Sequence, residues 1–219
     1  MLEGNISPIV KQLLEFHHKD MVIRQFRNYN EAAFQVAVAK LFPSKNWVPE
    51  MRLVNTNGTN GKYAFVDLFI NGKSENMWGG ISNVVLELKH VSLLGLYSGE
   101  EGKWKGNIDY DTMVKLDNTL KDESEIDLLE RNYYYWCKEN KSYKATKIRK
   151  IVNLGIDQVQ RYISLLKKGS VDDCNVELIS PGLGMIGGWL VVSIGSQRIL
   201  TKKIEFKKIK HEFILRKDK

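Results

Sequence analysis

The chain has 219 residues, 43% hydrophobic and 27% charged, which is typical of one globular domain with a sizeable core. Lysine and arginine outnumber aspartate and glutamate, 33 against 26, and this excess favours a polyanionic partner. Cys137 and Cys174 show no disulfide or zinc pattern, and no apolar run is long enough to span a membrane. We therefore expect an intracellular protein, in the cytoplasm or nucleus, with no membrane partner. Nothing in the sequence indicates its oligomeric state.

The first part of the chain is predicted to be helical. Residues 1–27 mix apolar and charged residues as a helical lead-in would. His17 and His18 are adjacent, so a helix would point them about a hundred degrees apart, which suits a shared metal ion poorly. A clearer helix begins near Asn30 and stops before Pro43. Its apolar stripe falls at helical spacing and consists of Phe34, Ala37, Val38, Leu41 and Phe42.

Glu31 stands at the head of this apolar stripe, three residues before Phe34. A carboxylate in this position could reach a neighbouring sheet and contribute to a cation site. Alternatively, it is an acid in a first helical turn, where it favours the helix dipole and has capping-box spacing from Asn28. The residues alone leave both interpretations open.

Three strands are expected after this helix: Trp47 to Val54, Tyr63 to Ile70, and Asn83 to His90. Asn-Gly steps provide the turns between them. The first strand holds Glu50, a spare acidic candidate. The other two carry charges in their middle, and strand alternation places Glu87 and Lys89 on one face.

Charges within strands need an explanation, because they are rarely buried unless they are paired or bind a metal. One interpretation is a site for a hard divalent cation, with Asp67 and Glu87 as oxygen ligands and Lys89 holding a water or a phosphate oxygen. The alternative is an ion pair between Lys89 and one of the two acids.

Residues 91–150 are predicted to form a helical insertion, with a helix from about Asp111 to Asn132. Four consecutive aromatic residues follow, Tyr133 to Trp136, and then a basic run, Lys138 to Lys150. Aromatic residues interleaved with lysines can stack on bases and hold phosphates. The interpretation favoured from sequence is different: the aromatic side chains pack on the main core.

A further helix is predicted from about Leu154 to Lys168. Gln158 and Tyr162 are four residues apart and therefore lie on one side of it. The glutamine could contact a substrate backbone or an attacking water, and the tyrosine could orient Lys89. The plainer interpretation is a helix surface with a half-buried tyrosine. Basic residues flank the pair, namely Arg161, Lys167 and Lys168.

The last part of the chain is expected to add strands at residues 175–179, 189–194 and 198–206, the last two as a hairpin. The glycines between Pro181 and Gly188 precede no helix, so we expect a flexible connection and not a phosphate loop. Residues 207–219 are predicted to be a solvated basic tail that could add affinity for polyanions.

Taken in order, these pieces resemble the PD-(D/E)XK nuclease superfamily. The Glu87-Leu88-Lys89 strand matches the superfamily's Glu-x-Lys signature, Asp67 lies on the preceding strand, and Glu31 lies on the opening helix. The Gln158-x-x-x-Tyr162 helix is similar to that of the RecB-type branch. The chain also looks like nuclease-like domains linked to AAA-ATPase-like modules or found in Crinkler-type effectors. The resemblance covers residues 28–206, with 91–150 as an insertion, and Val66 stands where many members have proline.

The resemblance implies an α/β fold with a restriction-endonuclease-like α-β-β-β-α-β core around a mixed central sheet. It also implies a nuclease that depends on a divalent metal, with DNA rather than RNA as the expected substrate. No base-reading element can be identified in the sequence, so low sequence specificity is expected. The alternative is a non-catalytic effector module on the same fold that binds nucleic acid or protein. A basic α/β protein in which Asp67, Glu87 and Lys89 merely form an ion pair is a further possibility.

The same resemblance implies roles for individual residues. Mg²⁺ or Mn²⁺ would be held by Glu31, Asp67, Glu87 and the carbonyl of Leu88. Lys89 would orient the attacking water or stabilise charge on the phosphate. Gln158 and Tyr162 would position the substrate backbone or Lys89. Contacts to nucleic acid would come from Gln158, Arg161, Lys167 and Lys168.

Overall fold

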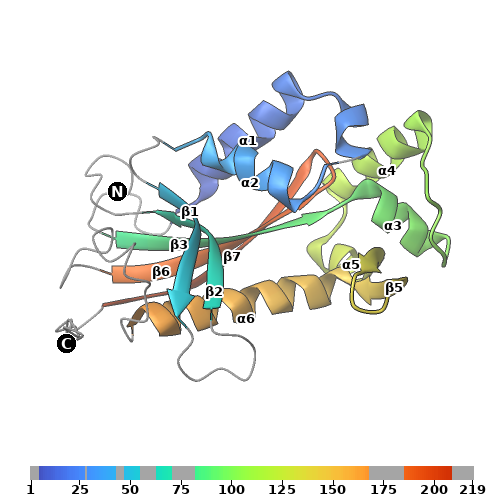
Figure 1. Ribbon diagram of the computed structural model, residues 1–219. Coiled ribbons are helices and arrows are strands. Elements are labelled where there is room, and N and C mark those ends of the chain that lie inside the picture. The colour runs from blue at the N-terminus through green and yellow to red at the C-terminus, as the bar shows by residue number, and fades with distance from the viewer. Residues whose placement is uncertain are drawn as a thin grey trace.

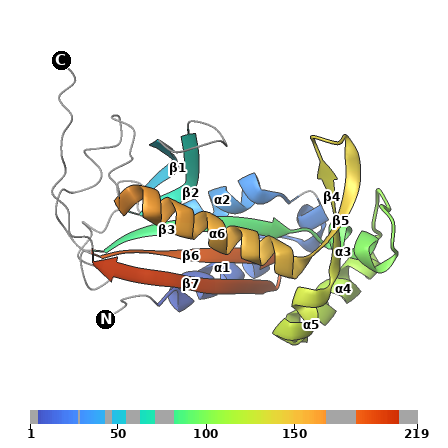
Figure 2. The same cartoon turned by 90° about the horizontal axis from the view of Figure 1, so that it is seen from below.

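The computed structural model describes residues 5–27, 29–42, 47–54, 63–70, 82–167 and 185–208. In these ranges a mixed five-stranded sheet lies between helices, and a second, two-stranded sheet stands beside it (Figure 1). The helices α1 (Ser7–Asp20) and α2 (Glu31–Ala39) lie over one face of the large sheet. The long helix α6 (Ile148–Lys167) crosses the other face (Figure 2). None of the helices in the described ranges has both the length and the apolar character needed to cross a membrane.

The large sheet has the strand order β1-β2-β3-β6-β7. Antiparallel pairing joins β1 (Trp47–Val54) to β2 (Tyr63–Ile70), and β2 to β3 (Ser82–Val91). β6 (Met185–Ile194) pairs parallel with β3, and β7 (Arg198–Lys208) pairs antiparallel with β6. Parallel neighbours need a crossover connection, which α6 supplies. The chain therefore has the predicted α/β class and mixed sheet, and the element order α2-β1-β2-β3-α6-β6 that the sequence predicted.

The centre of the sheet is buried on both sides. In β3, the side chains of Val84, Val85, Leu86 and Leu88 are fully inaccessible to solvent, as expected for a strand covered on both faces. Gly188 lets α6 pack closely on β6, because a Cβ atom there would lie 2.3 Å from the Val159 side chain. The expectation of a flexible glycine connection is therefore wrong for Gly187 and Gly188, which belong to β6.

Several predicted boundaries move. Asn30 caps α2, its side-chain oxygen accepting a hydrogen bond from the Ala33 amide at 2.9 Å, and the helix ends at Ala39. α6 begins at Ile148, six residues before the predicted start. β7 extends to Lys208, two residues into the predicted tail. Other predictions lie outside the described residues: the Asn28 capping box, the Asn-Gly turns, Lys168, Cys174, the strand at 175–179, the loop at 181–184 and the tail from 209.

The segment between β3 and α6 is helical only in part, and its predicted long helix is divided in two. It contains α3 (Leu93–Glu100), α4 (Tyr110–Asp122) and α5 (Glu125–Glu130), followed by a hairpin of β4 (Asn132–Cys137) and β5 (Ser142–Lys147). Ser124 ends the predicted long helix by capping α5, where its hydroxyl accepts from the Asp127 amide. The aromatic run then forms a strand, because aromatic residues favour extended backbone.

A buried aspartate ties this segment to the main sheet. Asp117 of α4 is fully buried and accepts hydrogen bonds from the Ser196 amide at 2.9 Å, from the Ser196 hydroxyl and from Gln197 Nε2 at 3.2 Å. Both donor residues lie in the turn between β6 and β7. In that turn Gly195 has a φ of 58°, and a Cβ atom would come within 2.2 Å of Asp117. The sequence analysis did not identify Asp117.

Asp117→Ala should therefore lower the free energy of unfolding by about 2–3 kcal/mol, because three donors in a partly buried turn lose their buried acceptor. Urea denaturation measures the change. Asp122→Ala is the matched control, since this aspartate is exposed on the same helix. Equal stability losses in the two variants would contradict the anchoring role of Asp117.

Candidate active site

The predicted acidic residues lie where β2 and β3 stop pairing. The register of the two strands covers only Leu68–Ile70 against Val84–Leu86. One step further, the Leu88 amide donates to Asp67 Oδ2 at 2.8 Å and no longer to a backbone carbonyl. The N–H and C=O groups of a strand residue point to the same side, so the Leu88 carbonyl also faces the widening gap. A side chain thus replaces the backbone ladder at this point.

Lys89 joins two acids from different elements. Its Nζ lies 2.7 Å from Glu87 Oε1 and 3.1 Å from Glu31 Oε1. Glu87 is 1% exposed, whereas Glu31, the first residue of α2, is about half exposed. We call Glu31, Asp67 and Glu87, with Lys89 among them, the acidic cluster. The structure thus brings together the four charged residues that the sequence selected.

Burial shifts the acid–base behaviour of the acidic cluster. Loss of solvent raises the pKa of Asp67 to about 6 and that of Glu87 to about 7, against the opposing effect of Lys89. Burial alone would lower the pKa of Lys89, but the charges of Glu87 and Glu31 overcome this and raise it above the ordinary lysine value. Near neutral pH, Lys89 is therefore charged, and Glu87 binds a proton more readily than an exposed glutamate does.

The acidic cluster is not balanced in charge. Three carboxylates surround one ammonium group, so the four groups together carry a formal charge of −2 when all of them are ionised. Glu87 Oε2 is buried without a hydrogen-bond partner, which is costly for an ionised oxygen. In the described part of the chain, no group of three or more His, Cys, Asp or Glu side chains is arranged to hold a metal ion, and Lys89 bridges Glu31 and Glu87. The unpartnered oxygen and the excess of carboxylates nevertheless suit a hard divalent cation.

Gln158 and Tyr162 approach the acidic cluster from the opposite face of the sheet. Gln158 Nε2 donates to the Tyr162 hydroxyl at 3.4 Å, so the predicted pair is formed. Tyr162 is 3% exposed, and its pKa is raised by burial and by the nearby negative charge of Glu87. The Arg161 guanidinium lies 5.4 Å from the centre of the Tyr162 ring. α6 therefore presents the Tyr162 phenol near Glu87, with the Gln158 amide and the Arg161 cation beside that phenol.

The predicted basic contacts do not all lie together. Lys167 lines a groove of about 540 Å³ against β7, together with Gln160 and Lys202. Helical spacing puts this groove on the flank of α6 away from Gln158. Lys168 lies outside the described residues. Of the three basic candidates, Arg161 is the one that the structure places beside Tyr162.

The sequence analysis missed Gln35. Its Nε2 donates to the backbone carbonyl of Asp67 at 2.6 Å and to Glu50 Oε1 at 3.1 Å. Glu50, the spare acidic candidate, adopts a positive φ of 47° and adds negative charge near Asp67. A signal for Gln35 was present, because it stands four residues after Glu31 and therefore on the same side of α2.

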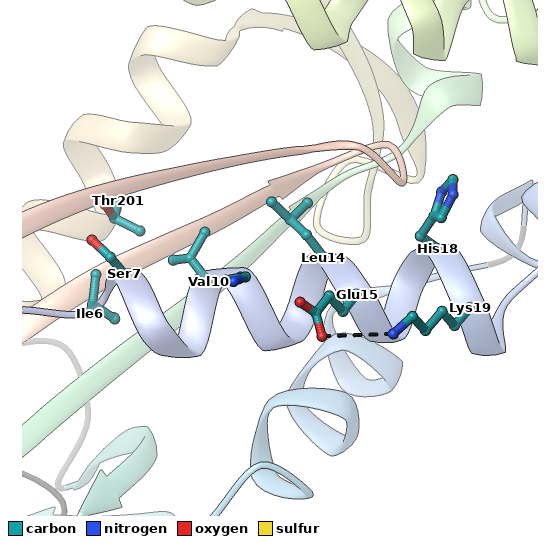
Figure 3. Close-up of a pocket in the computed structure, with 9 residues that line it drawn as sticks. Ile6, Ser7, Val10, Leu14, Glu15, His18, Lys19 and Thr201 are labelled. Carbon is teal, nitrogen blue, oxygen red and sulfur yellow. Dashed lines mark ion pairs between the residues drawn. The ribbon is translucent and has the colours of Figure 1, made fainter.

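Another groove, of about 540 Å³, lies along α1 (Figure 3). Its lining includes Val10, Leu14 and Thr201, and no residue of the acidic cluster contributes to it. His18 points into this groove, whereas His17 is buried and contacts the Tyr29 hydroxyl at 3.3 Å. The two histidines diverge as predicted.

The raised pKa of Asp67 makes stability depend on pH. The carboxyl group ionises near pH 6 in the folded chain against an ordinary 3.8, so the fold loses stability as pH rises through this interval. Asp67→Asn removes the loss, since an amide stays neutral and its oxygen can still accept from Leu88. Relative to the parent, the variant should gain roughly 1–3 kcal/mol between about pH 4 and pH 7 in urea titrations.

Asp157→Asn is the control for this measurement, because Asp157 is exposed on α6. It should follow the parent at every pH. A stability difference between Asp67→Asn and the parent that stays constant across the interval would contradict the burial of an ionisable carboxyl group at this position.

Comparisons with known proteins assign neither a family nor a function to this chain. No protein-family model, no curated protein and no solved structure matches the chain. The function is therefore inferred from the positions, burial and charge of the described side chains.

Proposed function

We propose that this chain is a divalent-metal-dependent nuclease that hydrolyses phosphodiester bonds, prefers DNA to RNA and has low sequence specificity. The observation that carries the proposal is the acidic cluster at the point where β2 and β3 part. Two features support a restriction-endonuclease-like core: the element order α2-β1-β2-β3-α6-β6, and the approach of Gln158 and Tyr162 from the face opposite α2.

The acidic cluster provides the donor set that Mg²⁺ or Mn²⁺ prefers, which is oxygen. Asp67 and Glu87 would hold the ion, Glu87 through its unpartnered oxygen, with help from Glu31 and the Leu88 carbonyl. When bound, the ion would make a water molecule more acidic and offset charge on the phosphate.

Lys89 has a separate role in this proposal. Its raised pKa keeps the ammonium group protonated at neutral pH, so it acts as a hydrogen-bond donor and not as a base. The ammonium group would donate to a phosphate oxygen as negative charge develops there. Glu31 and Glu87 hold it in position. Gln158 would contact the substrate backbone, and Tyr162 would keep Gln158 in place through their hydrogen bond.

An ion pair that only stabilises the fold explains this geometry less well. Lys89 satisfies Glu87 Oε1, but Glu87 Oε2 stays buried and unpartnered. Two further carboxylates lie near the pair and raise the cost of ionising it. A purely structural pair gives no reason to gather this excess of negative charge.

Cleavage assays test the proposal directly. Asp67→Asn, Glu87→Gln and Lys89→Met should each lower the rate of metal-dependent cleavage by about a hundredfold or more, since each removes a charged group from the acidic cluster. Single- and double-stranded DNA and RNA serve as substrates with Mg²⁺ or Mn²⁺, against a chelated sample. Asp122→Asn, at an exposed acid on α4 outside the acidic cluster, should cut at the parent rate. Binding without cleavage, insensitive to chelator, would instead identify the non-catalytic effector module.

Metal uptake gives a second test that does not depend on cleavage. Protons compete with the ion for Glu87, whose pKa is about 7, so Mn²⁺ affinity measured by calorimetry should rise about tenfold between pH 6 and pH 8. Glu87→Gln should abolish most of this rise. A parent chain that takes up no Mn²⁺ at pH 8 would leave the acidic cluster as an ion-pair network.

A further inference from the structure

The β4–β5 hairpin carries aromatic side chains that the core does not cover. It forms a sheet of its own, and Figure 2 shows it beside α3 and the first turns of α6, apart from the large sheet. Tyr135, Trp136 and Tyr143 are 39%, 50% and 41% exposed. The expectation that the aromatic run packs on the main core is therefore wrong for Tyr135 and Trp136, whereas Tyr133 does pack against the core. Trp136 and Tyr143 lie side by side, and large exposed apolar groups gathered in one place indicate a binding surface.

The aromatic rings form an ordered array. Trp136 and Tyr143 are directly paired across the hairpin, with ring centres 4.9 Å apart. Trp104, from the turn after α3, stacks on Tyr143 at 4.1 Å with the rings nearly parallel. We call Trp104, Trp136 and Tyr143 the aromatic platform. On the opposite face of the hairpin, Tyr135 stacks with Tyr133 at 6.5 Å.

Contacts with α3 and with the turn after it hold the hairpin and the aromatic platform in place. Gly95 of α3 leaves room for Tyr133, because a Cβ atom there would lie 2.2 Å from its ring. The Tyr134 hydroxyl donates to the Gly102 carbonyl at 2.7 Å and so fixes the turn that carries Trp104. A surface that is already ordered loses little conformational entropy when a ligand binds.

Positive charge surrounds the aromatic platform. Residues 138–150 contain six basic residues and one acid, Glu139. Lys147 and Arg149 pair with Glu130, and Lys144 donates to the Asn140 side chain. The structure shows no ion pair for Lys138, Lys141 or Lys150 within the described part of the chain. Cations free of acidic partners favour a polyanion over a neutral or basic protein surface.

A groove leads from the hairpin along α6 towards Gln158. It has a volume of about 470 Å³ and is lined by Ala145, Thr146, Lys147, Arg149, Lys150, Asn153, Leu154 and Asp157. Lys150, Leu154 and Gln158 are spaced four residues apart and therefore form one stripe on α6. Leu154 is 53% exposed. The ten residue steps from Ile148 to Gln158 correspond to about 15 Å along the helix axis.

We infer that the aromatic platform binds single-stranded nucleic acid through stacking of unpaired bases, with the neighbouring lysines on its phosphates. Exposed rings stack on any base, because every base has a π face. Duplex bases are already stacked on one another and offer no free face to the platform.

If the chain cuts nucleic acid as proposed, a strand held here would follow the α6 stripe to the acidic cluster. This path to the acidic cluster rests on the proposed function. It predicts a substrate with unpaired nucleotides near the bond that is cut.

Fluorescence anisotropy with the full chain in EDTA tests the inference without cleavage. The probes are a labelled oligothymidine of about twenty nucleotides, which exceeds the site size of typical stacking surfaces, and a duplex of the same length. We expect tighter binding of the single strand. Trp136→Ala and Tyr143→Ala should each weaken it about tenfold, whereas Trp136→Phe should keep most of the affinity because a ring remains.

Tyr110→Ala is the matched control, since Tyr110 is 47% exposed on α4, outside the hairpin, and should bind as the parent does. Thermal unfolding checks that each variant is folded. The inference is overturned if Trp136→Ala and Tyr143→Ala bind the single strand as tightly as the parent, or if the duplex binds equally well and responds equally to both changes. Loss of binding in these variants supports single-strand binding by the aromatic platform, whether or not the parent cuts nucleic acid in Mg²⁺. A parent that binds but does not cut would refute the nuclease proposal and leave the aromatic platform supported.

Discussion

The hydrogen bond from the Leu88 amide to the Asp67 carboxylate is the interaction on which the site depends. It ends the β2–β3 ladder without leaving a buried amide unsatisfied. Beyond it, β3 no longer pairs with β2, and Glu87 and Lys89 lie in this unpaired part of β3. A carboxylate thus takes the place of a backbone carbonyl where the ladder stops.

The gap also brings the two faces of the sheet together. α2 contributes Glu31 and Gln35 from one side, whereas α6 contributes Tyr162 from the other. The resulting environment is dry enough to raise the pKa values of Asp67 and Glu87, yet it remains net negative. Rigid helices and strands hold these groups, which suits a site whose chemistry depends on fixed electrostatics.

The sequence predicted the parts of the site that follow from local periodicity. Charges in the middle of apolar strands identified Asp67, Glu87 and Lys89, and a four-residue spacing identified Gln158 with Tyr162. Contacts set by tertiary packing were not predictable in this way. Asp117 looks like any helical acid until the β6–β7 turn closes over it, and Gly188 looks like loop material until α6 packs on it. The hairpin was missed because no Asn-Gly or similar turn signal separates β4 from β5.

The parallel pairing of β3 with β6 has a consequence for how the chain acquires its site. Glu87 stands beside Leu190, so the strand that carries two charged groups is flanked by one that emerges much later during synthesis. Contacts between distant parts of a chain form slowly, because a long loop must close first. The surroundings of Glu87 are consequently complete only once β6 has docked beside β3. A nascent chain that stops before β6 leaves β3, the strand that carries Glu87 and Lys89, without its parallel neighbour.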